Sequence, residues 1–346
     1  MLASTASPTP GSSTSYFSVA IALCGSIAYP FLLKAFHAGT SSGAGGMPFL
    51  GWLLLLLAIA VPVAGIEAAT RLGQLTVPSR RDLLAKRLAL LTIAAAPIFT
   101  ASGVLLHMAG GPINDTIFCL LFWGGAIALL LARWGDTATT SPVPFAKVPQ
   151  LRVAHGIGAL AIVLLFLAMH LTNHLFGLAG EAMHRHYMEM FESVYRARWI
   201  EPAVVLLFLF LVITGINLFW QHTKRPADVF RTLQIASGIY LVFFVLAHMN
   251  SVFFYARTFA NIPTDWNFAI GAPAGLLQDA WNIRLVPHYL LGVFFVLLHL
   301  VLGARGVALA HGLQEARANR LTWLGMLLSG AISVAIILGM TGVRVV

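Results

Sequence analysis

The sequence predicts an all-α fold, a polytopic bundle of about nine transmembrane helices. Hydrophobic residues make up 59% of the 346 residues and charged residues only 10%, whereas a soluble domain carries about 25% charged residues. Apolar runs recur along the whole chain, and a run of about 18 residues is long enough to cross a hydrocarbon core of about 30 Å. We therefore expect an integral protein of a bacterial-type cytoplasmic membrane, with lipid as its main surroundings.

Nine apolar runs define the expected spans. They lie at 17–36, 49–70, 88–108, 116–133, 153–177, 202–220, 232–256, 285–304 and 321–342. The longest polar connections between them are 71–87, 134–152, 178–201 and 257–284. The first 16 residues contain no Lys or Arg. They do not resemble the charged start of a signal peptide, so we expect the first span to be retained.

Basic residues predict which side of the membrane each connection faces. The connections after the second, fourth, sixth and eighth spans carry 14 of the 21 Lys and Arg residues: Arg71, Arg80, Arg81, Lys86, Arg87, Arg133, Lys147, Arg152, Lys224, Arg225, Arg231, Arg305, Arg317 and Arg320. Cytoplasmic loops are enriched in Lys and Arg. We therefore expect the N-terminus and these connections in the cytoplasm and the C-terminus outside. The same bias explains the net charge of +9 without a nucleic-acid partner.

The segment 136–150, DTATTSPVPFAKVPQ, is the best candidate for an internal linker. Its three prolines and small polar residues disfavour a helix. It separates an N-terminal four-span region, residues 1–135, from a five-span region, residues 151–346. Ten of the twelve histidines belong to the five-span region. The sequence assigns no role to the four N-terminal spans.

Two histidines on different spans, His170 and His248, are expected at the same depth in the membrane. His170 follows Arg152 by 18 residues and His248 follows Arg231 by 17, so at about 1.5 Å per residue both lie about 25 Å from the inner boundary. Two axial imidazoles on opposite faces of a porphyrin need this arrangement, which favours heme b. A single histidine within a span is more often hydrogen-bonded to a neighbouring helix. Five in or near the spans of one region favour a bound group: His170, His174, His248, His288 and His299.

A different metal site would use the pair His170 and His174, four residues apart on one helical face, together with His184 and His186. This spacing faintly resembles the histidine boxes of membrane di-iron hydroxylases and desaturases, although it lacks their clustered ligands. A di-iron oxygenase is therefore one alternative function. A non-redox channel or assembly subunit is the other.

Four segments in the second region resemble a known family. They are Arg152-x-x-His155 followed by MHLTNH at 169–174, FESVYRARWIEP at 191–202, LQIASGIYLVFFVLAH at 233–248, and VLLHLVLG at 296–303. Together they resemble the membrane-anchor cytochrome b of succinate dehydrogenases and fumarate reductases, of the single-chain, five-helix, diheme type. The resemblance covers about residues 150–342.

The resemblance implies roles for individual histidines. His170 and His248 match the two ligands of the outer heme, and His299 matches one ligand of the inner heme. The partner of His299 should lie within 208–215, FLFLVITG, where this chain has no histidine. We therefore expect one heme b, or two if another histidine near the inner boundary replaces the missing ligand. The candidates for that replacement are His155 and His222.

The outer connection 178–201 concentrates polar groups beside the expected heme. We expect Arg196 and Arg198 to pair with heme propionates, and a His or Glu to take part in quinone-linked proton transfer. His174 lies one turn farther out than His170, level with the porphyrin edge, a propionate or a quinone. For each residue of this connection taken singly, a solvated interfacial loop with ordinary ion pairs is the favoured explanation.

The predicted function is a heme b protein that exchanges electrons with the quinone pool. The sequence contains no nucleotide-binding motif, nucleophile elbow or soluble catalytic domain. We therefore expect a subunit of a larger quinone-linked oxidoreductase. The resemblance implies that iron–sulfur and flavoprotein subunits dock on its cytoplasmic side.

Overall fold

The computed structural model describes residues 13–41, 48–139 and 148–345, and within these ranges the chain is an all-α transmembrane bundle. Eight stretches are long and apolar enough to cross a membrane, and the count is nine if the bent pair Arg80–Thr92 and Ala95–Ala109 is one span. The predicted all-α fold class is thus confirmed, and the number of spans is close to the predicted nine. The spans are α1 (Ser13–Ser41), α2 (Pro48–Gly73), α3 (Arg80–Thr92) with α4 (Ala95–Ala109), α5 (Asp115–Ala132), α6 (Val148–Ile162) with α7 (Ala168–Phe176), α9 (Ile200–His222), α10 (Val229–Met249), α13 (Leu285–Ala310) and α14 (Glu315–Met340).

The third span is bent, whereas the sequence predicted one continuous run at 88–108. It begins earlier, at Arg80, where Ser79 and Asp82 form a capping box. It bends by 67° between α3 and α4. Pro97 explains the position of the bend, because a proline ring clashes with the carbonyl four residues earlier, here that of Ile93.

The fifth and seventh spans contain π-helical stretches. Val163–Leu167 separates α6 from α7, and Asn250–Ala260 extends α10. The first stretch ends three residues before His170 and the second begins two residues after His248. Wider π turns rotate the following side chains relative to a continuous α-helix, and such turns often occur at functional sites.

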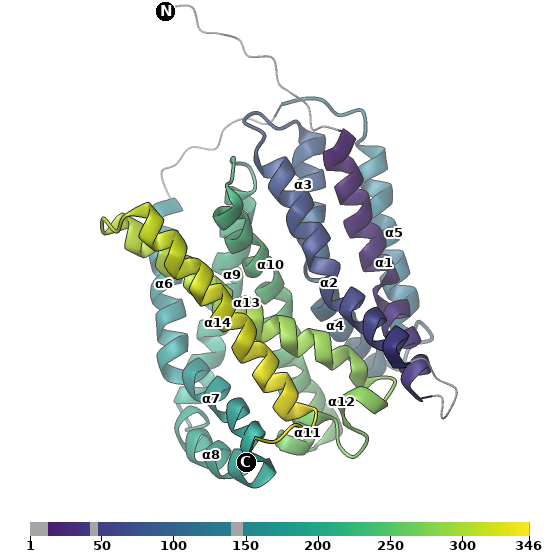
Figure 1. Cartoon of the computed structure of the whole chain (residues 1–346), viewed down its shortest axis with the longest axis vertical. Helices are drawn as coiled ribbons and strands as arrows, with labels where there is room; N and C mark the ends of the chain where they lie inside the picture. Colours follow the sequence, from purple (N-terminus) through teal and green to yellow (C-terminus); the bar gives the residue numbers. More distant parts are fainter. Residues whose placement is uncertain (1–12, 42–47, 140–147, 346) are drawn as a thin grey trace, which may run out of the picture.

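The connection 178–201, predicted as a polar connection between two spans, is mostly helical. Glu181–Tyr195 forms α8, which follows the sharp turn at Gly180, where φ is +104°. The connection 257–284 likewise contains the end of the second π-helical stretch and two short helices, α11 (Trp266–Ile270) and α12 (Gly275–Gln278). These segments cover the end of the bundle that also holds α7 (Figure 1).

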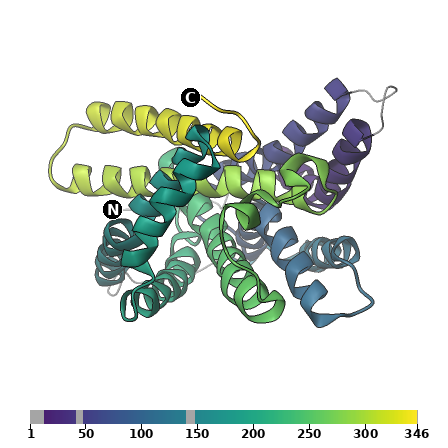
Figure 2. The same ribbon diagram turned by 90° about the horizontal axis from the view of Figure 1, so that it is seen from below.

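The two regions predicted from the sequence share one hydrophobic core. Helices α1–α5 lie on one side and α6–α9 on the other, with α10 between them in both views (Figures 1 and 2). Ala68 and Phe99 of the first region belong to the same buried cluster as Tyr240 and Phe295 of the second. The division at 136–150 stays a sequence prediction, since residues 140–147 of that segment lie outside the described residues.

Polar contacts join the two regions near both ends of the bundle. Arg284, immediately before α13, donates to the Asp115 carboxylate at the start of α5, with 2.6 Å between nitrogen and oxygen and both side chains largely buried. At the other end, the Lys86 ammonium donates to the Arg225 carbonyl at 3.0 Å. The backbone N–H of Ala227 donates to the Gly73 carbonyl at 2.8 Å. These bonds fix how the first four spans sit against α10.

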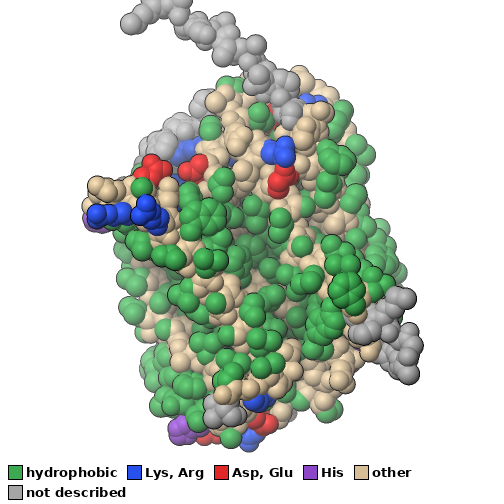
Figure 3. All heavy atoms as spheres, viewed as in Figure 1, with side chains coloured by type: hydrophobic (Ala, Val, Ile, Leu, Met, Phe, Trp, Pro, Cys, Tyr) green, Lys and Arg blue, Asp and Glu red, His purple; other side chains and the backbone are tan. Residues whose placement is uncertain are grey.

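The surface has the layered character of a membrane protein. Lys, Arg, Asp and Glu side chains gather at the two ends of the molecule, and hydrophobic side chains cover the belt between them (Figure 3). Large apolar side chains such as Leu164, Leu206 and Leu327 are exposed on this belt, where lipid tails would cover them.

The orientation of the chain in the membrane is a testable prediction. Helix α1 begins at one end of the bundle and the chain ends at the other (Figure 1). With the basic connections in the cytoplasm, a C-terminal reporter that fluoresces only in the cytoplasm should be dark. The same reporter inserted after Lys224 should be bright. A bright C-terminal fusion would show that the predicted orientation is inverted.

Candidate functional site

The structure brings His170 and His248 together as an outer pair. His170 lies in the first turn of α7 and His248 in the last turn of α10. Their ring centroids are 6.0 Å apart and their planes are inclined by 68°. Iron–imidazole bonds of about 2 Å, with each centroid about 1 Å behind its nitrogen, would place two axial rings about 6 Å apart. The outer pair therefore has the spacing of two ligands to one iron.

Aromatic rings hold the outer pair in position. Phe166 stacks on His170, with centroids 4.8 Å apart and planes inclined by 22°. Phe244 lies nearly parallel to His248, at 5.7 Å and 12°. These contacts restrict rotation of both imidazoles, as a pre-organised ligand site requires.

His155 and His299 form a second, inner pair. His155 lies on α6 and His299 on α13, and their ring centroids are 6.2 Å apart with planes inclined by 78°. The resemblance placed the partner of His299 within 208–215 of the sixth span, where this chain has no histidine. That span instead supplies Thr214, whose hydroxyl lies 2.8 Å from Nδ1 of His155. Ser237 of α10 makes the matching contact with Nδ1 of His299 at 2.9 Å.

The two hydroxyls also contact backbone carbonyls of their own helices. The Thr214 hydroxyl lies 2.7 Å from the Phe210 carbonyl, and the Ser237 hydroxyl lies 3.1 Å from the Gln234 carbonyl. With each hydroxyl proton on its carbonyl, the hydroxyl oxygen accepts from the imidazole. That arrangement places a proton on Nδ1 and leaves a lone pair on Nε2.

A polar cluster adjoins the outer pair. His174 lies 4.7 Å from His170 and 5.5 Å from His184, measured between ring centroids. Asn173 and His184 are buried, and the Asn173 amide nitrogen donates to Nε2 of His184 at 3.1 Å. Several buried atoms of this cluster and of nearby His288 have no hydrogen-bond partner among the described residues: Nδ1 of His174, His184 and His288, and Oδ1 of Asn173. Unpaired buried polar atoms are costly, and they mark where a ligand would be bound.

Charged residues of α8 and α9 form ion pairs near this cluster. Arg196 contacts Glu192 at 2.7 Å, and Arg257 contacts Glu201 at 2.7 Å. Partial burial raises the pKa of Glu192, against the lowering effect of Arg196. Arg198 is not brought to the histidines, because it is exposed and its guanidinium lies 5.2 Å from the centre of the exposed Trp199 ring.

An inner arginine cluster, composed of Arg152, Arg225, Arg231 and Arg305, lies at the other end of the bundle. The other three arginines are within electrostatic range of Arg231, as is the carboxylate of Asp228. His222 also lies within range of Arg152, Arg225 and Arg231. Arg152 precedes His155 by one turn, and Arg305 follows His299 by six residues on α13. Two of the four arginines, Arg152 and Arg305, therefore lie on the same helices as the inner pair.

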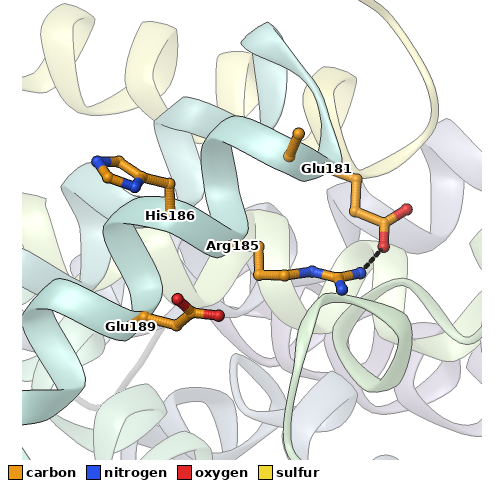
Figure 4. A pocket seen from close by; sticks show the side chains of 5 residues that line it. Glu181, Arg185, His186 and Glu189 are labelled. Carbon is orange, nitrogen blue, oxygen red and sulfur yellow. Dashed lines mark hydrogen bonds and ion pairs between the residues drawn. The ribbon is translucent and has the colours of Figure 1, made fainter.

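The exposed face of α8 contains a shallow open depression lined by Glu181, Ala182, Arg185, His186 and Glu189 (Figure 4). Glu181 and Arg185 form an ion pair there, and His186 points away from it. His184 is buried on the opposite side of the helix. His184 and His186 thus lie on opposite faces of α8 and cannot bind one metal ion together.

Comparison of the chain with family models, curated proteins and solved structures gives no match. The resemblance described above therefore stays a sequence-based prediction, and function is argued from the two histidine pairs and their surroundings. Sequence reasoning named all four histidines of these pairs. It missed Thr214 and Ser237, because isolated hydroxyls within apolar spans usually bond to their own helix.

Protonation of His184 should make the stability of the protein depend on pH. Burial lowers the pKa of His184 to about 4, although Asp265 and Glu181 act to raise it. The unfolded chain, with a histidine pKa of about 6.5, binds the proton first as pH falls. The stabilisation is complete above about pH 6.5 and is lost toward pH 4, with up to about 2 kcal/mol lost by pH 5.

Thermal unfolding of the purified protein at pH 7 and pH 5 tests this expectation. The drop in Tm should be smaller for His184→Gln than for the wild type, because glutamine does not titrate. His186→Gln, on the exposed face of the same helix, should keep the full drop. Equal drops in all three proteins would show that His184 does not carry the effect.

Proposed function

We propose that this protein is a heme b electron carrier of the membrane that exchanges electrons with quinone. The observation that carries the proposal is the outer pair, His170 and His248, with 6.0 Å between ring centroids. The rings come from different spans and converge inside the bundle. Axial ligation of a porphyrin from both faces needs this arrangement.

The residues around the outer pair fit a heme. When bound, the heme supplies one-electron chemistry, and the protein sets its potential and access. His170 and His248 would hold it, and Phe166 and Phe244 keep their rings from turning. His174 stands nearly perpendicular to His170, at 85°. From that position its Nδ1, which has no hydrogen-bond partner among the described residues, would donate to a heme propionate.

The polar cluster beside the outer pair supports quinone as the electron partner. A quinone head group offers carbonyl oxygens that accept hydrogen bonds and take up protons on reduction. Nδ1 of His184 is a buried donor without a partner among the described residues, because Nε2 accepts from Asn173. Glu192, whose pKa is raised by burial, is suited to exchange protons near the membrane boundary.

Catalysis on a water-soluble substrate would need further subunits. The described chain consists of membrane helices and short connections. The resemblance to membrane anchors of succinate dehydrogenases and fumarate reductases suggests iron–sulfur and flavoprotein partners. They would dock at the end that holds the inner arginine cluster, which the charge bias places in the cytoplasm.

The alternatives make different spectroscopic predictions. A di-iron oxygenase needs several carboxylate and histidine ligands close together. Within the ranges that the structure describes, no group of three or more His, Cys, Asp or Glu side chains is arranged to hold a metal ion. A channel or assembly subunit would lack a chromophore. Purified heme b protein should show a Soret band and, when reduced, a sharp α-band.

Substitution of individual histidines tests the ligand assignment. His170→Ala and His248→Ala should each abolish the low-spin spectrum of the outer heme, because each removes one axial ligand. His174→Ala should retain that spectrum and shift the midpoint potential, because His174 acts on the heme edge. Visible spectra and redox titration of the purified variants measure both effects.

His107→Ala provides the matched control. His107 lies on α4 against Tyr255 and Phe259, and its loss should leave the spectrum unchanged. Loss of the outer heme in His174→Ala, together with its retention in His170→Ala, would show that the ligand is assigned one helical turn too far inward.

A further inference from the structure

We propose that the inner arginine cluster binds the phosphate of an anionic phospholipid, whose acyl chains lie along the exposed face of α6. Three observations support a lipid at this place. Arginine side chains converge there from separate segments, few carboxylates pair with them, and an apolar depression adjoins Arg152. Such a lipid site is independent of the proposed function, which assigns these arginines no part in heme or quinone chemistry.

Four segments bring the arginines together. Arg152 lies in α6, Arg225 in the connection between α9 and α10, Arg231 in α10 and Arg305 in α13. The other three arginines are within electrostatic range of Arg231. Like charges repel each other more strongly near a protein surface than in bulk water. An anion bound among the four arginines would offset this repulsion.

Carboxylates of the described residues compensate only part of the charge. Asp228 caps α10, where its side chain accepts from the backbone N–H of Arg231 at 2.7 Å. Glu315 is 76% exposed and lies 3.8 Å from Arg305. Arg152 is exposed and forms no ion pair within the ranges that the structure describes. Two carboxylates therefore stand against four arginines, which leaves the cluster with a net positive charge.

The arginine side chains are positioned to bind a phosphate. The Arg305 guanidinium lies 4.2 Å from the centre of the Phe230 ring and donates to Oδ1 of Asn319 at 2.8 Å and 3.0 Å. Among the described residues, the Arg231 guanidinium donates once, to Gln234 at 3.1 Å, although a guanidinium has five N–H donors. Its other donors remain for a ligand, and arginine binds phosphate oxygens through paired hydrogen bonds.

The depth of the arginines favours a lipid over a soluble acidic protein. Arg152 is the fifth residue of α6, and Arg305 lies five residues before the last residue of α13. At about 1.5 Å per residue, both lie about 6 to 8 Å inside the helix ends, at the level of lipid head groups. The Arg305 side chain is only 12% exposed. A phosphate inserted between helices would reach it, whereas a flat protein surface would not.

An apolar depression on α6 adjoins the cluster. It is shallow and is lined by Pro149, Gln150, Val153, Ala154 and Ile157. Val153 and Ile157, one helical turn apart, are 62% and 65% exposed. Because Arg152 precedes Val153, the depression begins at the level of the cluster and extends toward the membrane centre. A phospholipid combines the same two elements, a phosphate at the boundary and acyl chains below it.

A bound phosphate would join helices that otherwise pack in separate groups. Helix α6 packs mainly against α9, whereas α10 and α13 pack against each other. A phosphate held by Arg152 together with Arg231 and Arg305 would connect α6 to both of the other helices. Because a ligand that binds only the folded state stabilises it, anionic lipid should raise the Tm of the protein.

Lipid titrations of the full-length purified protein test the inference. Native mass spectrometry with added phosphatidylglycerol or phosphatidylcholine gives the affinity for each lipid. Phosphatidylglycerol should bind more than about fivefold more tightly, since one arginine near anionic lipid contributes about a factor of five. Arg152→Gln and Arg231→Gln should each weaken its binding about fivefold, and together about 25-fold, without weakening phosphatidylcholine binding. Arg152→Gln alone, at an exposed position, keeps the test decisive if the double variant does not fold.

Arg80→Gln with Arg133→Gln provides the matched control. Both arginines are exposed, one at the start of α3 and the other after α5, and neither belongs to the inner arginine cluster. Loss of these two charges should leave phosphatidylglycerol binding and the accompanying rise in Tm unchanged. Equal weakening in both double variants would show a general effect of surface charge and would overturn the specific site.

Further outcomes separate the source of the phosphate and the fate of each proposal. If inorganic phosphate alone produces the same rise in Tm, the cluster binds a soluble anion and the lipid proposal fails. Equal affinity for the two lipids would also reject it and would leave the cluster as a docking face for an acidic subunit. Heme content is measured on the same samples. A protein without heme that still prefers phosphatidylglycerol would reject the proposed function alone.

Discussion

Polar groups inside this bundle have to find their partners within the protein, because the hydrocarbon core offers no water. The rule is followed closely at the inner pair, where Thr214 and Ser237 bind one nitrogen of each imidazole. It is followed again where Arg284 meets Asp115 in a largely buried ion pair. Around His174, by contrast, buried atoms have no hydrogen-bond partner within the ranges that the structure describes. These atoms adjoin the outer pair, so a ligand bound there would supply their partners.

Helix α10 is the element on which both histidine pairs depend. It carries Ser237 and His248, and it packs against α4 and α2 of the first region as well as α9 and α13 of the second. The Tyr240 hydroxyl, buried within this packing, donates to the His288 carbonyl of α13 at 3.0 Å. The four N-terminal spans thus support the helix that carries one side chain of each pair's surroundings, Ser237 and His248, which gives them a structural role.

The sequence predicted the outer histidine pair more completely than the inner pair. His170 and His248 were predicted to meet because both follow a basic boundary by nearly equal lengths. His155 was named only as a replacement ligand, and nothing in its sequence neighbourhood indicates that it faces His299. The relative rotation and tilt of α6 and α13 determine that contact, and both result from packing against α9 and α10. The π-helical stretch Val163–Leu167 also changes which side of the span faces inward beyond it.

The sequence by itself determined the all-α class and, to within one, the number of spans, because the length and apolarity of a run decide whether it can cross a membrane. The sequence located the third span only approximately and did not predict its bend, although Pro97 lies within the predicted run. A proline indicates where a helix can bend, but the packing of adjacent helices sets the angle. It did not predict α8, because a mixed polar segment folds against whatever apolar surface lies beside it. Which imidazole faces which, and which hydroxyl contacts each Nδ1 atom, was decided by the tertiary structure alone. Those contacts join residues tens of positions apart, and only packing of whole helices brings them together.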